Sequence, residues 1–129
     1  MKIRVGFGYD VHPLKDGNDF WLGGVKISHT KGAVGHSDAD TLIHAMCDAF
    51  LGAANLGDIG THFPDTSEEF KGIDSKILLK KVAQMLKKEG YEIGNVDCTV
   101  TLQSPKISPY IPEMKKILAE TLKIPLKNI

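Results

Sequence analysis

The sequence predicts a single α/β domain. Its N-terminal part has strand character, because Lys2 to Asp10 is rich in β-branched and aromatic residues, and Gly23-Gly24 separates two short apolar runs within Phe20 to Ile27. Helical and strand-like segments follow. With 129 residues and 42% hydrophobic content, the chain can bury one substantial core but is too short for two. We therefore expect one domain over residues 1–129.

The first helix is expected from about Asp38 to Asn55. Ser37 to Asp40 has the form of a capping box, with Ser37 as N-cap and Asp40 at the third helical position. The helix is apolar almost all round, which predicts burial on several sides. Its few polar residues, which include Asp40, His44 and Asp48 at i, i+4 spacing, therefore need partners.

Two more helices and a strand are expected after a loop from Gly57 to Gly72, which is long enough to suggest a function. The second helix should run from Asp74 or Ser75 to Glu89, where Gly90 stops it. Apolar and polar residues alternate from Val96 to Gln103, which predicts a strand with one buried face. The third helix should begin at Pro112 and reach about Leu122.

Charge and composition exclude several classes of protein. Sixteen basic residues balance sixteen acidic ones, so there is no broad positive field for nucleic acid or an anionic membrane surface. No apolar stretch is long enough to span a bilayer. Cys47 and Cys98 lie in apolar segments without CxxC spacing, which favours reduced thiols. The N-terminus lacks the features of a signal or transit peptide. We expect a cytoplasmic protein.

Three residues are candidates for a metal site. Asp10 and His12 are two apart at the end of the first predicted strand, so their side chains project from the same face. His44 lies on the apolar helix. Two imidazoles and a carboxylate suit zinc, which in catalytic sites leaves a fourth position for substrate. The residues alone leave open that His44 is a hydrogen-bonded core residue instead.

Candidate ligand-binding residues also have alternative roles. His36 and Ser37 precede the predicted first helix, whose free N–H groups could hold a phosphate, although Ser37 could be only a cap. Asp58 could bind a polyol or belong to a turn, and residues 63–66 have the same two interpretations. Lys106 could reach a phosphate or stay solvated.

Taken together, these stretches resemble the 2-C-methyl-D-erythritol 2,4-cyclodiphosphate synthase family of non-mevalonate isoprenoid biosynthesis. The resemblance covers essentially the whole chain in unbroken order. The matching segments are GYDVH at residues 8–12, GHSDAD at 35–40, LIHAMCDAFLGAANLGDIG at 42–60, FPDT at 63–66 and GNVDCTVTLQSPK at 94–106.

The resemblance implies roles for individual residues. The implied zinc ligands are Asp10, His12 and His44, and the implied catalytic residue is His36, as a stabiliser of the transition state. The substrate would contact the metal-binding strand, the phosphate pair, the segment that holds the methylerythritol unit, a neighbouring loop and a cytidine pocket. These residues are Asp10, Val11, His12, His36, Ser37, Asp58, Ile59, Gly60, Phe63, Pro64, Asp65, Thr66, Ser67, Leu102, Gln103, Ser104, Pro105, Lys106, Ile107 and Ser108.

The resemblance also implies an architecture and a reaction. The fold would be α/β (an α+β sandwich) with a four-stranded mixed sheet and helices on one face, assembled as a C3 homotrimer with active sites between subunits. The enzyme would be a phosphorus-oxygen lyase that converts 4-diphosphocytidyl-2-C-methyl-D-erythritol 2-phosphate into the 2,4-cyclodiphosphate and CMP. Its cofactors would be zinc and a second divalent cation, magnesium or manganese.

One departure from the family concerns the end of the sequence. The family continues past the third helix into further strands that carry a catalytic threonine and a glutamate for the second metal. We therefore expect the 129 residues to lack C-terminal strands, and a protein ending at Ile129 to be inactive. Two other classes stay open: a small phosphatase that uses the same metal site to activate water, and a non-catalytic binding module in which His44 belongs to the core.

Overall fold

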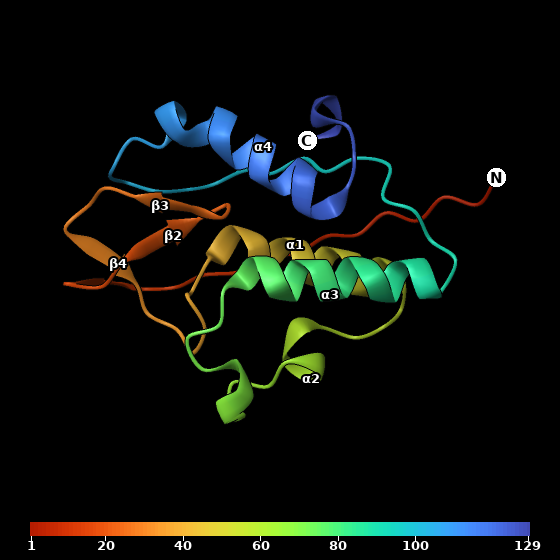
Figure 1. Cartoon of the computed structure of the whole chain (residues 1–129), viewed down its shortest axis with the longest axis horizontal. Helices are drawn as coiled ribbons and strands as arrows, with labels where there is room; N and C mark the ends of the chain where they lie inside the picture. Colours follow the sequence, from red (N-terminus) through yellow and green to blue (C-terminus); the bar gives the residue numbers. More distant parts are fainter.

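A computed structural model describes residues 1–129, and its centre is a pair of helices. Helices α1 (Thr41–Ala53) and α3 (Ser75–Lys88) lie side by side and run in the same direction (Figure 1). Helix α4 (Ile111–Leu122) lies on one side of this pair. The short helix α2 (Ile59–His62) and the 3₁₀ turn η1 (Glu68–Phe70) lie on the other. The 3₁₀ turns η2 (Ser108–Tyr110) and η3 (Leu126–Asn128) flank α4. The expected α/β class is confirmed.

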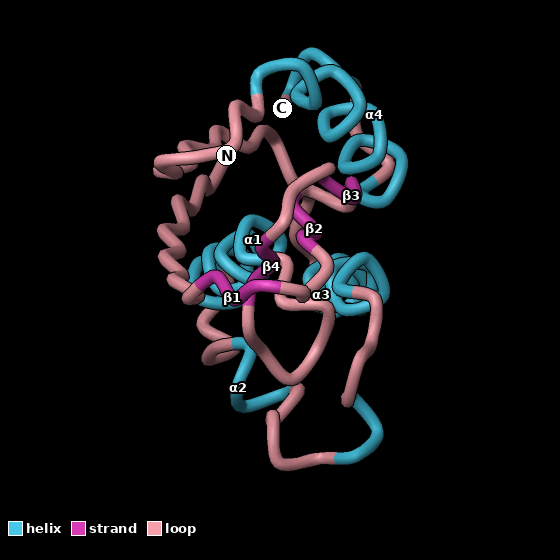
Figure 2. The backbone as a smooth tube through the Cα atoms, turned by 90° about the vertical axis from the view of Figure 1, so that its left-hand side faces the viewer, coloured by secondary structure: helices cyan, strands magenta, loops and turns pink.

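Two antiparallel strand pairs accompany the helices. Strands β2 (Phe20–Leu22) and β3 (Val25–Ile27) form a hairpin that lies between α4 and the α1–α3 pair (Figure 2). Gly23 and Gly24 make its turn with φ angles of 59° and 78°, as a two-residue hairpin turn of this kind requires. Strands β1 (Leu14–Asp16) and β4 (Lys31–Ala33) form the second pair. The strands expected within residues 20–27 are therefore confirmed.

These four strands form two separate two-stranded sheets and not the expected four-stranded mixed sheet. The N-terminal segment, residues 2–12, is extended but makes no backbone hydrogen bond. It lies directly on α1, where a Cβ at Gly6 or Gly8 would overlap the carbonyl groups of Ala49 or Ala45. The glycines thus let the segment pack on a helix, so the strand pattern corresponds to an extended chain without a partner strand.

The segment of residues 93–102 behaves in the same way. Its apolar residues, Val96, Cys98, Val100 and Leu102, are half-buried and alternate with exposed polar ones, so the predicted faces are confirmed. Its only backbone hydrogen bond, however, is from Val96 N–H to the Asn128 carbonyl at 2.8 Å. The predicted strand is therefore present as an extended segment with one buried face and no ladder.

Helix α1 begins later than predicted, because Asp40 and not Ser37 is its N-cap. The Asp40 carboxylate accepts hydrogen bonds from Ile43 N at 3.1 Å, Gly23 N at 2.9 Å and Gly24 N at 2.7 Å. Burial raises the pKa of this fully buried carboxyl, while the three N–H groups oppose the rise. One side chain therefore caps α1 and fixes the β2–β3 turn against it.

The two later helices are confirmed. Asp74 is the N-cap of α3, with its carboxylate accepting from Lys76 N at 2.9 Å, and Gly90 follows the helix with a φ of 85°. Pro112 lies in the first turn of α4. The main apolar core is formed by α1, α3 and α4 and includes Ile43, Cys47, Leu51, Leu79, Val82 and Leu118. Both cysteines are free thiols. None of the helices combines the length and the hydrophobicity of a membrane span.

Candidate metal centre

The structure brings Asp10, His12 and His44 together. Asp10 and His12 come from the N-terminal segment that packs on α1, and His44 comes from the first turn of α1 itself. Asp10 Oδ2 lies 3.0 Å from His12 Nδ1 and 3.4 Å from His44 Nδ1. The exposed fractions of the three side chains are 24%, 16% and 13%, in that order. One ligand atom from each residue lies within 4.8 Å of the others. The predicted cluster is therefore present and partly accessible.

A cation fits this cluster. Asp10 Oδ2 is buried, and no hydrogen bond of acceptable geometry reaches it, although two imidazole nitrogens are near. Leaving a buried carboxylate oxygen unpaired is costly. Tetrahedral zinc with bonds of about 2.0 to 2.1 Å keeps its ligand atoms about 3.3 Å apart, close to the 3.0 and 3.4 Å that separate Asp10 Oδ2 from the two imidazole nitrogens. The donor set and the unpaired oxygen both match the zinc site that the sequence predicts.

The charges of the cluster suit a metal ligand set. Burial by itself raises the pKa of the Asp10 carboxyl, but the contacts with His12 and His44 together lower it more, so the pKa lies well below its ordinary value. The contact with Asp10 raises the pKa of His12, and burial opposes that rise. Asp10 is thus an anion at neutral pH and a strong partner for any cation between the imidazoles.

The opposite edge of the His44 ring contacts two serines. Its Nε2 lies 2.9 Å from Ser75 Oγ and 3.0 Å from Ser37 Oγ. Ser75 is fully buried at the first position of α3, and both its backbone N–H and its hydroxyl donate to the Asp38 carboxylate. Ser37 does not cap α1, but its Oγ accepts from Ala39 N at 3.2 Å. The predicted phosphate residue Ser37 therefore lies beside a predicted metal ligand.

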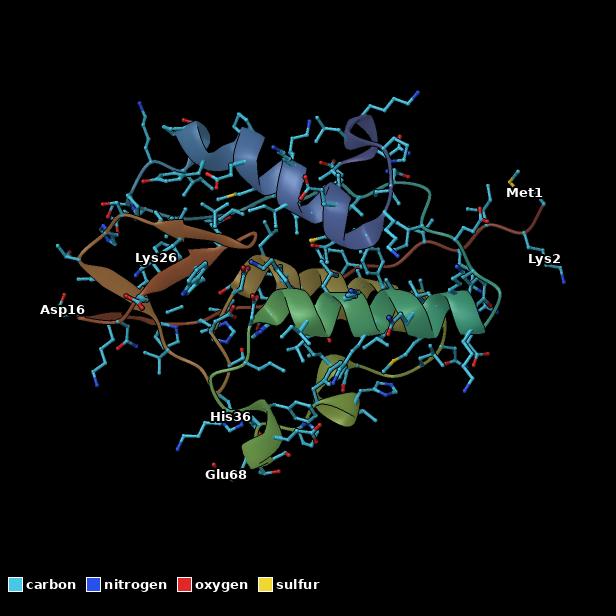
Figure 3. All side chains as sticks on the ribbon, in the orientation of Figure 1. Met1, Lys2, Asp16, Lys26, His36 and Glu68 are labelled. Carbon is cyan, nitrogen blue, oxygen red and sulfur yellow. The ribbon has the colours of Figure 1, made fainter.

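His36 lies next to the loop that leads into η1. Its Nε2 is 2.7 Å from the Ser67 carbonyl, and Figure 3 shows His36 beside the turn that carries Glu68. Gly72 N also donates to the His36 carbonyl at 2.7 Å. The structure thus joins His36 to the predicted substrate loop. Of that loop, Phe63 packs edge-on against Phe70 in the core, whereas Pro64, Asp65 and Thr66 are exposed.

Asp58 is the N-cap of the short helix α2. Its Oδ1 accepts from Thr61 N at 2.9 Å and from the Thr61 hydroxyl at 2.8 Å. The hydrogen bond from Thr61 N–H lowers the pKa of this exposed carboxyl. Nearby, Asp48 Oδ1 accepts from Ile59 N at 2.8 Å, which ties α2 to α1. The structural role of Asp58 is clear, and its Oδ2 makes no hydrogen bond to another residue of the chain.

The segment predicted to bind cytidine does not join this cluster. Leu102 and Ile107 pack with the hairpin β2–β3 on the side of α4. Asp58 and the loop of residues 63–67 lie on the other side of the α1–α3 pair (Figures 1 and 2). Within one chain the predicted substrate residues therefore form two separate groups.

Sequence reasoning missed Ser75, Asp38 and Thr41. The sequence indicates Ser75 and Asp38 only as parts of helix ends, and they are 37 positions apart, so no local pattern could join them. Thr41 Oγ1 lies 3.1 Å from His12 Nδ1. In the sequence Thr41 looks like an ordinary residue in the first turn of a helix. A search for hydroxyls one turn from each predicted histidine ligand could have found Thr41, but not Ser75.

Comparison with known proteins gives a consistent family. The chain matches the YgbB family over residues 3–129. A protein of Parabacteroides distasonis named 2-C-methyl-D-erythritol 2,4-cyclodiphosphate synthase is 60% identical over all 129 residues, which cover 80% of its length. One of Cytophaga hutchinsonii with the same name is 57% identical, also over the whole chain and 81% of its own length.

Solved structures agree with the sequence relatives. A CDP-bound 2C-methyl-D-erythritol-2,4-cyclodiphosphate synthase superposes with a TM-score of 0.92 at 34% identity, over 98% of this chain and 84% of that one. The bifunctional IspDF of Campylobacter jejuni superposes with a TM-score of 0.95 at 41% identity, over 99% of this chain and 35% of that longer one. The chain therefore belongs to the 2-C-methyl-D-erythritol 2,4-cyclodiphosphate synthase (YgbB) family.

Proposed function

We propose that the protein converts 4-diphosphocytidyl-2-C-methyl-D-erythritol 2-phosphate into 2-C-methyl-D-erythritol 2,4-cyclodiphosphate and CMP. The observation that carries this proposal is the cluster of Asp10, His12 and His44, in which the buried Asp10 Oδ2 has no hydrogen bond. In the reaction an oxygen of the 2-phosphate bonds to the β-phosphorus. The bond from that phosphorus to the bridging oxygen breaks, and CMP leaves with the bridging oxygen. No protein nucleophile is needed.

Asp10, His12 and His44 would hold zinc, which supplies Lewis-acid polarisation of the β-phosphate when it is bound. The proposal includes a second divalent cation, magnesium or manganese, and assigns no residue of this chain to it. Holding the two phosphates in line and neutralising their charge is together worth on the order of 10 kcal/mol in reactions of this kind.

Ser37 and His36 would act on the phosphates directly. The Ser37 oxygen already accepts from Ala39 N, and its hydroxyl proton can be donated to a phosphate oxygen. His36 Nε2 donates to the Ser67 carbonyl, which can only accept. This contact orients the His36 ring, so that Nδ1, when protonated, can donate to an oxygen that gains charge in the transition state.

The active site would form between subunits of a C3 homotrimer. Two observations support this assembly. The two groups of predicted substrate residues lie on opposite sides of the α1–α3 pair, so residues from two copies would be needed to enclose one substrate. In addition, Ile3, Val5, Phe7, Tyr9 and Val11, which we call the odd-numbered stripe, are between 66% and 89% exposed along one face of the N-terminal segment. A continuous apolar stripe of this kind favours association.

A single domain with a four-stranded mixed sheet is part of the same proposal. The extended segments of residues 2–12 and 93–102 carry backbone N–H and C=O groups that have almost no partners in the structure. Strands with free ladder groups pair readily. Partner strands of the kind that the family resemblance implies after the last helix would complete the sheet.

The test is the fate of solvent oxygen. The purified full-length protein, with zinc and magnesium, is given the substrate in ¹⁸O-labelled water, and the products are identified by mass spectrometry and ³¹P NMR. Intramolecular cyclisation gives CMP and a cyclic diphosphate without ¹⁸O. Release of inorganic phosphate that contains ¹⁸O would instead indicate the phosphatase alternative and contradict the proposal. No product and no bound metal would favour the binding-module alternative.

A further inference from the structure

The side of His44 that faces away from Asp10 is enclosed by polar groups with a defined direction of hydrogen bonding. The Ser75 hydroxyl donates to the Asp38 carboxylate, and Ser75 Oγ lies 2.9 Å from His44 Nε2. On the other side of the ring, His44 Nδ1 lies 3.4 Å from Asp10 Oδ2. The two ring nitrogens therefore have separate environments.

The direction of these hydrogen bonds follows from what each group can donate. An ionised carboxylate can only accept, so the Ser75 hydroxyl proton is directed at Asp38. Ser75 Oγ then has only lone pairs left for His44, and Nε2 must carry the proton of that contact. Ser37 Oγ, 3.0 Å from Nε2, accepts from Ala39 N and can also accept from His44. With the proton on Nε2, the lone pair of Nδ1 is available to a cation held beside Asp10, whose Oδ2 lies 3.4 Å from Nδ1.

We propose that Ser75 and Asp38 are positioning residues that hold His44 as the Nε2–H tautomer and thereby present its Nδ1 to the metal. The proposal rests on the assignment of Asp10, His12 and His44 as metal ligands. It assigns no contact with substrate to either residue. Hydrogen bonding of a ligand histidine through its other nitrogen is known to fix ring orientation and raise metal affinity, commonly by 10- to 100-fold.

The placement of the two residues supports this role. Ser75 is fully buried, although serine is usually exposed, and its hydroxyl does not cap α3, because Asp74 is the N-cap. Asp38 also accepts from Asp40 N at 3.1 Å and from Ser75 N at 2.9 Å. These bonds hold the carboxylate between the beginnings of α1 and α3. The position of the Ser75 hydroxyl therefore depends on how the N-terminal turns of α1 and α3 are held together.

The first measurement uses no variant of Ser75. Two-dimensional ¹H–¹⁵N spectra that correlate ring nitrogens with carbon-bound protons are recorded on the full-length protein with bound zinc. The His44 signals are identified by their loss in His44→Gln. We expect the proton of the His44 ring on Nε2 and the zinc on Nδ1. Zinc on Nε2, with the ring proton on Nδ1, would overturn the proposal.

The second measurement compares zinc affinity, by competition with a chromophoric chelator, between Ser75→Ala, Ser75→Thr and the control Asp74→Ala. Ser75→Ala should weaken zinc binding by about 10- to 100-fold. Ser75→Thr keeps a hydroxyl and should restore most of the affinity. Asp74→Ala removes the N-cap of α3, one residue away, so it should lower the thermal midpoint without changing zinc affinity.

Two outcomes would overturn the proposal. Zinc affinity in Ser75→Ala within about twofold of the parent would show that His44 needs no support, and an equal loss in Asp74→Ala would show that only the order of the α3 terminus matters. If Ser75→Ala does not fold, the tautomer of the parent decides. If the parent binds no zinc, the proposed metal function fails together with this proposal, whereas a parent that binds zinc through Nε2 overturns the positioning role alone.

Discussion

At the scale of single residues, His44 is the side chain on which metal binding depends most clearly. We expect His44→Gln to lose stoichiometric zinc and to lower activity by at least about 100-fold, because two ligands hold a tetrahedral ion poorly. The fold should survive, since only the first turn of α1 changes. Metal content is measured by elemental analysis of dialysed protein.

His29→Gln is the matched control for that experiment. His29 contacts Phe20, with ring centroids 6.3 Å apart, and lies outside the metal cluster. The His29→Gln variant should keep its zinc and its activity. Normal zinc and normal activity in His44→Gln would mean that His44 is only a hydrogen-bonded core residue.

Asp58→Asn separates the capping role of Asp58 from a role in substrate binding. The cap uses Oδ1, which asparagine retains as a carbonyl, whereas the charge and the second carboxylate oxygen are lost. We expect unchanged thermal stability and a fall in kcat/KM of about tenfold or more, because charge-assisted hydrogen bonds to the substrate hydroxyls are lost. Unchanged kcat/KM would show that Asp58 serves only α2.

At the scale of elements, Asp40 connects a helix and a hairpin. Asparagine offers one acceptor atom where Asp40 uses both carboxylate oxygens, so in Asp40→Asn an amide NH₂ must face a backbone N–H. We expect the free energy of unfolding to fall by about 2 kcal/mol, the cost of an unsatisfied buried donor. Denaturation in urea measures it. Exposed Asp19→Asn is the control, and equal stability of the two variants would contradict this account of Asp40.

The contact of the N-terminal segment with α1 can be tested with two glycines. In Gly8→Ala the new methyl group meets the Ala45 carbonyl, so the segment must move away from α1 and carry Asp10 away from His44. We expect weaker zinc binding. Gly52 lies in α1, and a Cβ added there would have nothing within 4 Å, so Gly52→Ala should instead raise stability, by up to about 1 kcal/mol. Equal zinc affinity in Gly8→Ala and the parent would refute the close packing.

Elements with strong local signals can be predicted from sequence, and long-range contacts cannot. The N-cap of α3 and the glycine after it are recognisable because the partners lie within a few residues. The prediction that Ser37 caps α1 is wrong, because a capping box is only a local pattern. The preference of Asp40 for this role depends on Gly23 and Gly24, which are distant in sequence.

The candidate site shows the same division. Asp10 and His12 share a face because of their spacing, and His44 stands out as a polar residue on an apolar helix, so the ligand set can be found. The surroundings of His44 cannot, because Ser75 reaches it only through the packing of α3 on α1.

At the scale of the whole molecule, the odd-numbered stripe makes assembly testable. Val5→Lys places a charge where the side chain is 89% exposed, so the isolated chain should fold normally while its association is disrupted. Analytical ultracentrifugation should show a trimer for the full-length parent and mainly smaller species for Val5→Lys. Ile77→Lys on α3, 47% exposed and outside the stripe, is the control. A trimer of unchanged stability in Val5→Lys would exclude the stripe from the interface.

The central claim is that activity depends on a metal held by Asp10, His12 and His44, and one titration tests it directly. Zinc is removed from the full-length protein with a chelator and returned stepwise in the presence of magnesium, while bound zinc and cyclic diphosphate formation are measured in the same samples. The account predicts no activity without zinc, and a rate that rises in proportion to bound zinc until one ion per chain is reached. Formation of the cyclic diphosphate at full rate by the zinc-free protein would contradict it.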